Sequence, residues 1–329
     1  MDLQKRIGLM ARLGNYMVSA EPDWNAAKEK AYLQNNWFIP QFIDLATKNI
    51  ATEFLQEKRM EDWVRPYNFP TTQQQPKTVG IVMAGNLPLV GFHDFLSVFI
   101  SGHKQRIKLA SGDQELLKHL VAKLTDWEPS VTSVVAFSEN LKGCDAYIAT
   151  GSNNTSRYFQ YYFGKYPNII RKNRTSVAIL DGTESARDLE QLADDVYLYF
   201  GRGCRNVTKL YVPRGFDFTP VLDAFSKYTY LAEHYKYKNN YDYQLALLIL
   251  NKQYYMTNGS ILLTEAASLF TPIGRVNYEY YDSKPAVFEK DSLQCMVGAD
   301  HIPFGQAQLP GLCDYADGID ILQFLRTSL

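Results

Sequence analysis

The chain has 329 residues, of which 46% are hydrophobic and 21% are charged. This balance is that of a folded protein large enough for two domains, and it excludes a disordered chain. The 34 basic and 35 acidic residues leave a net charge of −1 and form no basic stripe, so we expect no nucleic-acid partner.

The cysteines and histidines suggest neither disulfides nor a metal site. The four cysteines, at positions 144, 204, 295 and 313, fit neither a disulfide framework nor paired CxxC zinc ligands, and the five histidines are scattered. No apolar run is long enough to span a membrane, and the first ten residues lack the apolar core of a signal peptide. We therefore expect a cytoplasmic protein whose cysteines stay reduced.

The N-terminal part of the chain is predicted to be helical. Apolar residues at helical spacing predict an amphipathic helix over residues 3–17. A second helix is predicted from Trp24 to Trp37, and a third from Pro40 towards Trp63. A proline-containing segment then ends the helices and leads into a chain of different character.

From Thr78 onward, strands alternate with helices, which predicts parallel βαβ units in a doubly wound sheet. The predicted strands cover residues 78–83, 106–109, 131–137 and 145–150, and the predicted helices cover residues 89–100, 114–125 and 152–163.

A second α/β block is predicted to begin near Thr175. Its predicted strands cover residues 175–180, 207–212, 260–264, 275–281 and 293–297, and its predicted helices cover residues 185–200, 220–230 and 243–252. We interpret the chain as one domain of residues 1–172, a second of residues 173–305, and a tail of residues 306–329. The tail is expected to return to the first domain or to form an oligomer interface.

A glycine-rich turn carries Cys204 between a predicted helix and a predicted strand. Gly201 and Gly203 are expected to end the preceding helix and to leave room for a substrate carbonyl beside the thiol. The positive charges of Arg202 and Arg205 favour the thiolate, which is the nucleophilic form of cysteine. The alternative is that Cys204 is a buried, small apolar residue.

Three further turns follow strands of the first sheet, and ligands of such sheets bind beyond the carboxyl ends of the strands. The amide of Asn86 can donate to an oxyanion or simply cap a helix. Lys108 can hold a ribose or a phosphate, or keep an edge strand soluble. Gly151 and Ser152 lead into a helix whose first N–H groups suit a phosphate, although Ser152 can equally be an N-cap. The dinucleotide fingerprint GxGxxG is absent, so an ordinary Rossmann site is not expected.

The order of these motifs resembles that of the aldehyde dehydrogenase superfamily. It is most similar to the acyl-CoA reductase branch, which includes the fatty acid reductases of bacterial luminescence. The resemblance covers most of Thr78 to Gly305 and includes the turn Pro303-Phe304-Gly305. It implies an aldehyde dehydrogenase-like α/β fold, with a nucleotide-binding domain in residues 1–172 and a catalytic domain in residues 173–305.

The resemblance also implies a role for each motif. Cys204 would be the nucleophile that takes the acyl group, and the amide of Asn86 would form the oxyanion hole with the Cys204 backbone N–H. Lys108 matches the family lysine that holds the adenosine ribose. Gly151 and Ser152 match the turn beside the pyrophosphate.

Three departures from the family pattern bear on the reaction. Segment 168–174 lacks the glutamate base of the oxidising enzymes, which fits a reductase that does not activate water against its thioester. Ser111 stands where NAD enzymes often carry a glutamate, so a carboxylate that would repel a 2′-phosphate is missing, and Lys104 and Arg106 lie close in sequence to meet that phosphate. The chain is also shorter than a typical family member.

The resemblance therefore implies reduction of an acyl-CoA to an aldehyde through a thioacyl-cysteine, with NADPH accepted at least as well as NADH. The alternatives are an acyl-phosphate reductase on the same scaffold, and a cysteine acyltransferase or a silent binding protein that does not use nicotinamide. We expect the chain to form a homo-oligomer such as a dimer.

Overall fold

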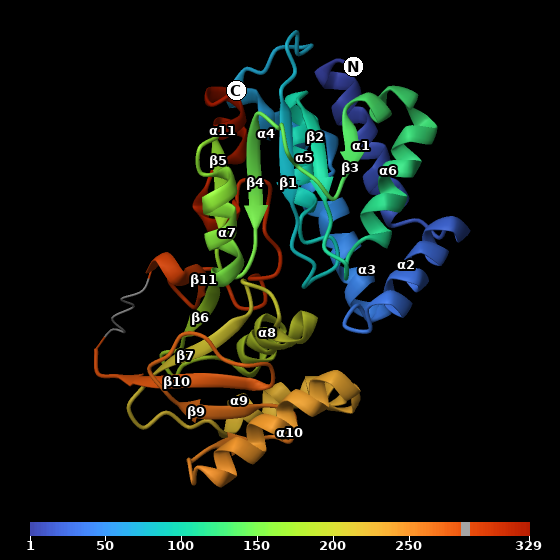
Figure 1. Cartoon of the computed structure of the whole chain (residues 1–329). Coiled ribbons are helices and arrows are strands. Elements are labelled where there is room, and N and C mark those ends of the chain that lie inside the picture. Colours follow the sequence, from blue (N-terminus) through green and yellow to red (C-terminus); the bar gives the residue numbers. More distant parts are fainter. Residues whose placement is uncertain (284–289) are drawn as a thin grey trace. The chain divides into compact units, whose positions relative to one another are not determined.

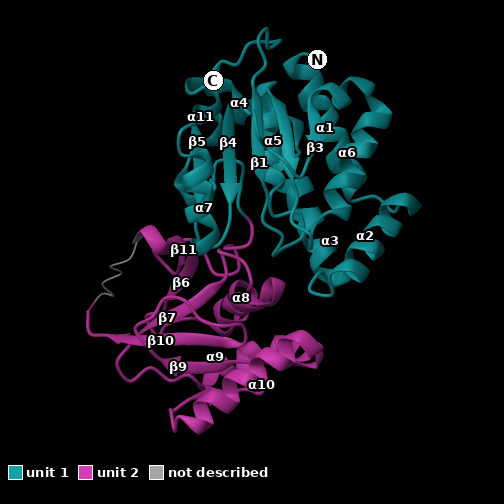
Figure 2. Ribbon diagram, viewed as in Figure 1, with its two compact units in different colours: residues 1–173, 310–329 teal, residues 174–309 magenta. Residues whose placement is uncertain are grey.

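The computed structural model describes residues 1–283 and 290–329, which form two compact units. Unit 1 comprises Met1–Asn173 and Pro310–Leu329, and unit 2 comprises Arg174–Leu309 (Figure 2). The chain passes from unit 1 to unit 2 after residue 173 and returns to unit 1 after residue 309. The predicted domain boundaries were after residues 172 and 305. Each unit is built around its own β-sheet, named sheet A in unit 1 and sheet B in unit 2 (Figure 1).

Sheet A is a doubly wound parallel sheet with the strand order β3-β2-β1-β4-β5. Its strands are β1 (Thr78–Val82), β2 (Lys104–Lys108), β3 (Val135–Phe137), β4 (Ala146–Thr150) and β5 (Asn168–Arg171). The chain moves outward from β1 to β3 and then returns to β4 on the other side of β1. The switch point of the sheet therefore lies between β1 and β4, which is where ligands of doubly wound sheets bind.

Helix α5 (Phe92–Ser101) lies at the centre of unit 1. Nine of its ten residues are buried, because it packs on β1 and β2 and also contacts α1 (Leu3–Met17) and α11 (Ile321–Thr327). A helix covered on all sides is expected to be largely apolar around its circumference, and six of the nine buried residues of α5 are apolar. The C-terminal helix α11 thereby belongs to the core of unit 1.

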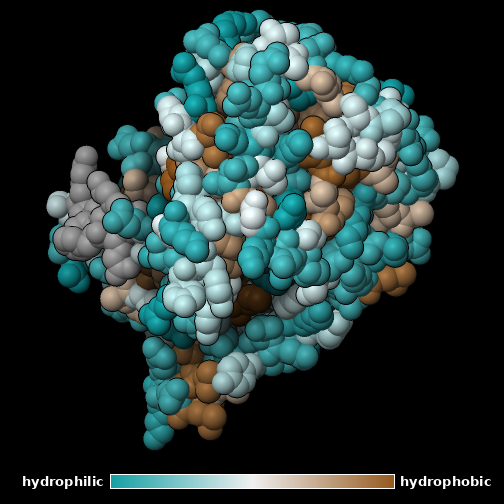
Figure 3. Space-filling view, turned by 45° about the horizontal axis from the view of Figure 1, so that its top comes forward, coloured by the Kyte–Doolittle hydropathy of each residue, from teal (hydrophilic) through white to brown (hydrophobic). Residues whose placement is uncertain are grey.

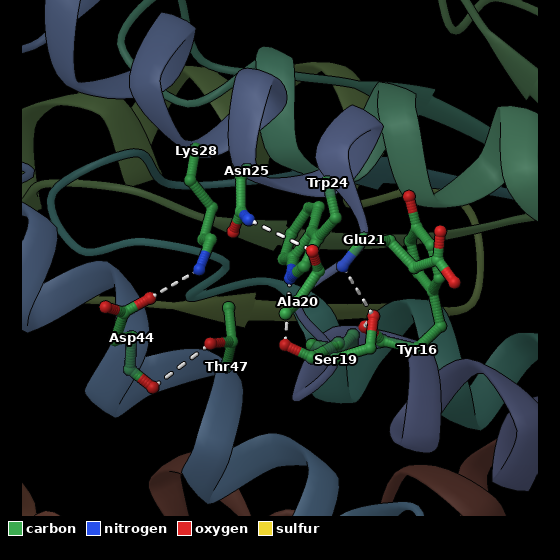
Figure 4. Close-up of polar contacts among 10 residues, drawn as sticks. Tyr16, Ser19, Ala20, Glu21, Trp24, Asn25, Lys28, Asp44 and Thr47 are labelled. Atoms are coloured by element: carbon green, nitrogen blue, oxygen red, sulfur yellow. Dashed lines mark hydrogen bonds and ion pairs between the residues drawn. The ribbon is translucent and has the colours of Figure 1, made fainter.

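The other helices of unit 1 are α2 (Pro22–Gln34), α3 (Pro40–Asn49), α4 (Glu57–Val64), α6 (Glu115–Trp127) and α7 (Asn153–Phe163). Prolines occupy the first position of α2 and α3, where a missing N–H costs nothing. Figure 4 shows how the first three helices are joined. The indole N–H of Trp24 donates to the carbonyl of Met17 at 2.8 Å, and Lys28 forms an ion pair with Asp44 at 2.7 Å.

Sheet B has the strand order β11-β6-β7-β10-β9-β8 and is parallel except for the pairing of β8 with β9. Its strands are β6 (Thr175–Ile179), β7 (Val207–Pro213), β8 (Met256–Thr257), β9 (Leu262–Glu265), β10 (Arg275–Tyr281) and β11 (Leu293–Val297). The helices of this unit are α8 (Ala186–Tyr197), α9 (Thr219–Phe225) and α10 (Tyr235–Leu250). The predicted fold class, a doubly wound parallel sheet followed by a second α/β unit, is confirmed.

Several predicted elements are wrong in detail. The third helix is three pieces, α3, a π-helical turn over residues 50–54 and α4. Predicted strand 131–137 begins as a 3₁₀-helix over residues 129–133, and only its last three residues form β3. Strands β5 and β8 were not predicted, and α10 begins eight residues before its predicted start at residue 243.

The end of α8 also differs from its predicted end at residue 200. The helix stops at Tyr197, and Tyr199 and Phe200 take left-handed backbone conformations with φ of 57° and 59°. Both rings are nevertheless buried. The apolar spacing that extended the predicted helix to Phe200 therefore reflects burial in a different backbone conformation.

The face drawn in Figure 3 has the hydropathy of an ordinary globular protein surface. Hydrophilic residues cover most of the face in Figure 3, and the hydrophobic residues on it form small groups. Within residues 1–283 and 290–329, no helix combines the length and apolar character that a membrane crossing requires. No cluster of three or more His, Cys, Asp or Glu side chains in this described part is placed to bind a metal ion.

Candidate active site

Three of the predicted turns leave the same edge of sheet A. The register places Val82 of β1 level with Lys108 of β2 and with Ala149 of β4. The loop with Asn86 follows β1, Lys108 ends β2, and Gly151 follows β4, so all three lie beyond the carboxyl ends of adjacent strands. This edge holds the switch point of the sheet, which makes it the candidate nucleotide site of unit 1.

The loop with Asn86 is locked against the loop that follows β2. A Cβ atom on Gly85 would lie 2.6 Å from the Cβ of Ala110, so only glycine fits there. Leu89 has a left-handed φ of 56°, and its backbone N–H donates to the Asp113 carboxylate at 2.9 Å. Asn86 itself is half-buried in this fixed loop.

Lys108 lies on an interior strand, because β2 pairs with both β1 and β3. The alternative of a solubilising edge-strand lysine is therefore wrong. The side chain of Lys108 is 44% exposed, and its ammonium group donates to the carbonyl of Glu139 at 3.3 Å and lies 3.5 Å from the Glu139 carboxylate. Ser111 is exposed in the loop that follows β2.

Lys104, which was considered as a cation for the 2′-phosphate, lies at the other end of β2 from the loop with Ser111. Lys104 begins β2 and Lys108 ends it, so the two lysines lie about 13 Å apart at opposite edges of the sheet. Arg106 lies midway along the strand and donates to the carbonyl of Lys142 at 3.0 Å. Of the cationic residues on β2, Lys108 is therefore the one nearest in sequence to Ser111.

The structure of the turn after β4 is compatible with Ser152 as a helix N-cap and with Ser152 as a residue beside a pyrophosphate. The Ser152 hydroxyl accepts from the Thr155 N–H at 3.2 Å and is the N-cap of α7. Gly151 is required by packing, because a Cβ there would lie 2.9 Å from the ring of Phe159. Ser152 is exposed, so it can cap the helix and still face a ligand, and its role beside a pyrophosphate stays a prediction.

The buried ion pair between Arg171 and Asp94, which lies at the ends of β4 and β5, was not predicted from the sequence. Arg171 ends β5 and Asp94 lies on α5, with exposures of 4% and 6% and a separation of 2.7 Å. The same guanidinium nitrogen lies 3.3 Å from the Thr150 hydroxyl, at the end of β4. Such a pair is retained in a core only when the charges satisfy each other, and its position fixes the ends of β4 and β5. The available signal was an arginine at the end of the apolar pair Ile169-Ile170.

In unit 2, Asn206 determines the shape of the turn that carries Cys204. Its side chain is fully buried. The amide nitrogen donates to the carbonyls of Asp195, Val196 and Leu198, at 3.1, 3.2 and 2.9 Å, and the amide oxygen accepts from the Gly203 N–H at 2.7 Å. The end of α8 is therefore capped by an asparagine from beyond the turn, and the helix stops at Tyr197, before the glycines Gly201 and Gly203 that were expected to end it.

Cys204 is exposed, so the alternative of a buried apolar residue is wrong. Its carbonyl accepts from the Ser176 hydroxyl at 3.0 Å, which ties the turn to the start of sheet B. The same hydroxyl lies 3.0 Å from the thiol of Cys295. Burial raises the pKa of the Cys295 thiol, and Arg205 opposes this shift, so part of the positive charge beside Cys204 acts on a second thiol.

Asp195 connects the cysteine turn with the turn at Pro303-Phe304-Gly305. Its carboxylate accepts from the N–H groups of Gly305 at 2.7 Å and Ala307 at 3.0 Å, while its carbonyl accepts from Asn206. Burial raises the pKa of Asp195 to about 7, and the two N–H donors act in the opposite direction. Two segments that lie 100 residues apart in the sequence are thus fixed to the end of one helix.

The other three cysteines differ in their surroundings. Cys144 is buried, Cys295 is half-buried and Cys313 is exposed. Burial and the nearby carboxylates of Asp314 and Asp320 raise the pKa of the Cys313 thiol. Exposure alone therefore does not single out Cys204, whose distinguishing feature is its rigid glycine-containing turn.

The two α/β units, one with a doubly wound parallel sheet and one with an exposed cysteine before a strand, are those of an aldehyde dehydrogenase-like fold. The sequence profile of the acyl-CoA reductase (LuxC) family matches residues 43–221, which is more than half of the chain. The chain belongs to this family. The matched range includes all six predicted site residues, and the predictions of the family and of an oxidoreductase acting on acyl or aldehyde groups are confirmed.

Solved structures with similar folds are aldehyde dehydrogenases and related enzymes. Aldehyde dehydrogenase 21 from Physcomitrella patens, in complex with the reaction product succinate, has a TM-score of 0.68 and 12% identity over 91% of this chain and 74% of its own. An NADP dependent enzyme from E. coli has a TM-score of 0.65 and 12% identity over 90% and 73%. The NAD+ complex of an aldehyde dehydrogenase from Bacillus cereus has a TM-score of 0.62 and 14% identity over 90% and 72%.

These identities support the fold alone. This chain spans from 56% to 74% of the length of the similar solved chains. No curated protein sequence matches it. Its substrate, its cofactor and the roles of its site residues are therefore proposals.

Proposed function

We propose that the protein reduces an acyl-CoA thioester to an aldehyde, with Cys204 as the nucleophile. The observation that carries this proposal is the exposed thiol of Cys204 in a turn held by Asn206, within a chain of the acyl-CoA reductase family. Gly203, which carries no side chain, precedes the exposed Cys204, and a thioester carbonyl would approach the sulfur from this turn.

The proposed reaction has two stages. The thiolate of Cys204 attacks the thioester carbonyl, and the C–S bond to CoA breaks, so that CoA leaves as a thiolate and takes up a proton. Hydride then reduces the enzyme-bound thioester, and the C–S bond to Cys204 breaks to release the aldehyde. In both stages negative charge develops on the carbonyl oxygen, and the amide of Asn86 and the backbone N–H of Cys204 would donate to it.

The residues at the carboxyl edge of sheet A fit a nicotinamide dinucleotide. When bound, this cofactor supplies the hydride. Lys108 would hold the adenosine ribose, Ser111 would lie near its 2′ position, and Gly151 and Ser152 would lie beside the pyrophosphate. We propose that NADPH is accepted at least as well as NADH, because the exposed Ser111 leaves no carboxylate at that position to repel a 2′-phosphate. The fold itself occurs with both cofactors, as the E. coli and B. cereus enzymes show.

The test is an assay for aldehyde formation from a series of acyl-CoA chain lengths, with NADPH and with NADH. Aldehyde formation that is lost in Cys204→Ala and retained in Cys313→Ala supports the proposal. Reduction of acyl phosphates but not of acyl-CoA would identify the other reductase. Saturation-transfer NMR with NADPH separates the remaining alternatives, because an acyltransferase that does not use nicotinamide gives no signal. A silent protein that binds the cofactor forms no thioester on Cys204.

A further inference from the structure

One carboxylate of unit 1 lies between two predicted functional loops and has no part in the proposed reaction. Asp113 is buried in the loop that follows β2, directly before α6. One of its oxygens accepts from the Leu89 N–H, and the other has no hydrogen-bond partner among the described residues. Acidic side chains are seldom buried in this way, because desolvation of the charge is costly. Retention of a carboxyl group here calls for a specific use.

Leu89 lies three residues after Asn86 and holds a conformation that a leucine rarely adopts. A left-handed φ costs a branched residue of this kind on the order of 1–2 kcal/mol, so other contacts must maintain it. Two hydrogen bonds do so. The Leu89 N–H donates to Asp113, and the Leu89 carbonyl accepts from the Phe92 N–H at 2.9 Å, at the start of α5.

The same carboxylate lies in the loop that contains Ser111. The backbone of this loop is fixed from two sides. Gly85 packs against Ala110 so closely that no side chain fits, and the amide of Asn35 donates to the Gly112 carbonyl at 3.1 Å. A displacement of the loop after β2 is therefore transmitted through Asp113 and Gly85 to the loop with Asn86.

We propose that Asp113 is a positioning residue that sets the amide of Asn86 by holding the Leu89 N–H, and that it thereby couples Asn86 to the loop in which the cofactor is bound. The inference rests on the proposed function of Asn86 and Ser111. Asp113 touches neither substrate nor cofactor and acts through the backbone of residues 86–89. Removal of its carboxyl group releases the loop, while an amide at the same place still accepts from Leu89.

The experiment follows the rate at which Cys204 is acylated by an acyl-CoA, measured by rapid-quench mass spectrometry. We expect Asp113→Ala to lower the rate about tenfold or more, which is part of the roughly 100- to 1,000-fold loss that removal of an oxyanion donor causes. The acyl-CoA concentration for half-maximal rate is expected to change less than threefold. Asp113→Asn should stay within about threefold of the wild type, and Asp126→Asn, an exposed position on α6, should have no effect.

A double-variant cycle separates positioning from a general structural role. If Asp113 acts through Asn86, then Asn86→Ala combined with Asp113→Ala is no slower than Asn86→Ala alone. Additive losses in the double variant overturn the proposal. So does an Asp113→Ala protein that is acylated at the wild-type rate, or an Asp113→Asn protein as slow as the alanine variant.

A second readout keeps this inference separate from the proposed function. Hydrogen–deuterium exchange of the peptide covering residues 84–91 should be faster in Asp113→Ala than in the wild type, and near the wild-type rate in Asp113→Asn. If wild-type Cys204 is not acylated at all, the proposed function fails. In that case unchanged exchange in the alanine variant overturns the role of Asp113, and faster exchange supports its hold on the loop.

Discussion

Asn206 accepts a hydrogen bond from the backbone N–H of Gly203 at 2.7 Å, and this contact closes the turn on both sides of Cys204. The same side chain caps the end of α8 through three carbonyls. The position of the thiol and the end of the helix therefore depend on one buried amide.

Replacement of Asn206 by alanine should destabilise the protein and slow the acylation of Cys204. The change leaves the Gly203 N–H and the three helix carbonyls without their buried partner, which costs on the order of 3 kcal/mol. Urea denaturation measures the free energy of unfolding, with Asn239→Ala on the exposed face of α10 as the control. Equal stability of the two variants would show that the amide does not hold the turn.

Stability at different pH should reveal the buried carboxyl group of Asp113. Burial raises its pKa to about 7, whereas an aspartate in the unfolded chain titrates near 4. Between these values the folded state keeps a proton that the unfolded state has lost, so the contribution of Asp113 to stability falls as the pH rises from about 4 to about 7 and is constant above.

Asp113→Asn lacks this titration. Its free energy of unfolding relative to the wild type should therefore increase from pH 5 to pH 8, by about 2 kcal/mol. Urea denaturation at four pH values, with Asp126→Asn as the control, measures the difference. Parallel stability profiles of the wild type and Asp113→Asn would contradict a raised pKa.

Sequence patterns predicted the bounds of an element correctly where the burial of neighbouring residues alone determines its structure. Strands β10 and β11 have their predicted bounds. The residues of β10 alternate in polarity after the turn at Gly274, and β11 is a short, mostly apolar run that ends before Gly298. Strand β5 was missed because it has only four residues and depends on its pairing with β4. The end of α8 was misplaced because its cap, Asn206, comes from beyond the following turn.

The candidate site was predictable to the same extent. The order of the motifs located Asn86, Lys108 and Gly151 after strands, and parallel pairing then brings those strand ends to one edge. The supporting residues were not predictable. Nothing in the sequence around Asp113 or Asp195 distinguishes them from exposed aspartates. Only the folded chain places their carboxylates against the backbone N–H groups of Leu89 and Gly305.

Two glycine substitutions should have opposite effects on stability. Gly85→Ala places a methyl group 2.6 Å from the Cβ of Ala110, so the loop with Asn86 has to move, at a cost of about 1–3 kcal/mol. Gly8→Ala lies within α1, where the added Cβ has no atom within 4 Å, and it should stabilise the protein by about 0.5–1 kcal/mol. Thermal and urea denaturation of both variants test this. A tolerated Gly85→Ala would mean that the two loops are not locked together.

The acyl group should remain on the enzyme when acyl-CoA is supplied without reduced cofactor. Segment 168–174 forms β5 and the start of the following connection, and it contains no carboxylate that could take a proton from water beside a thioester. Intact-protein mass spectrometry should show the mass of one acyl group, which is lost as aldehyde when NADPH is added. The adduct should map to Cys204 and be absent in Cys204→Ala.

The exposed Cys313 is the matched control for this experiment. Both residues are exposed, and partial desolvation together with nearby carboxylates raises the pKa of the Cys313 thiol above its usual value, which lowers its thiolate fraction at neutral pH. Cys313→Ala should therefore leave the adduct unchanged. An adduct on Cys313, or none with any acyl-CoA, contradicts the mechanism. Rapid release of the free acid would keep Cys204 as the nucleophile and show that a base outside segment 168–174 activates water.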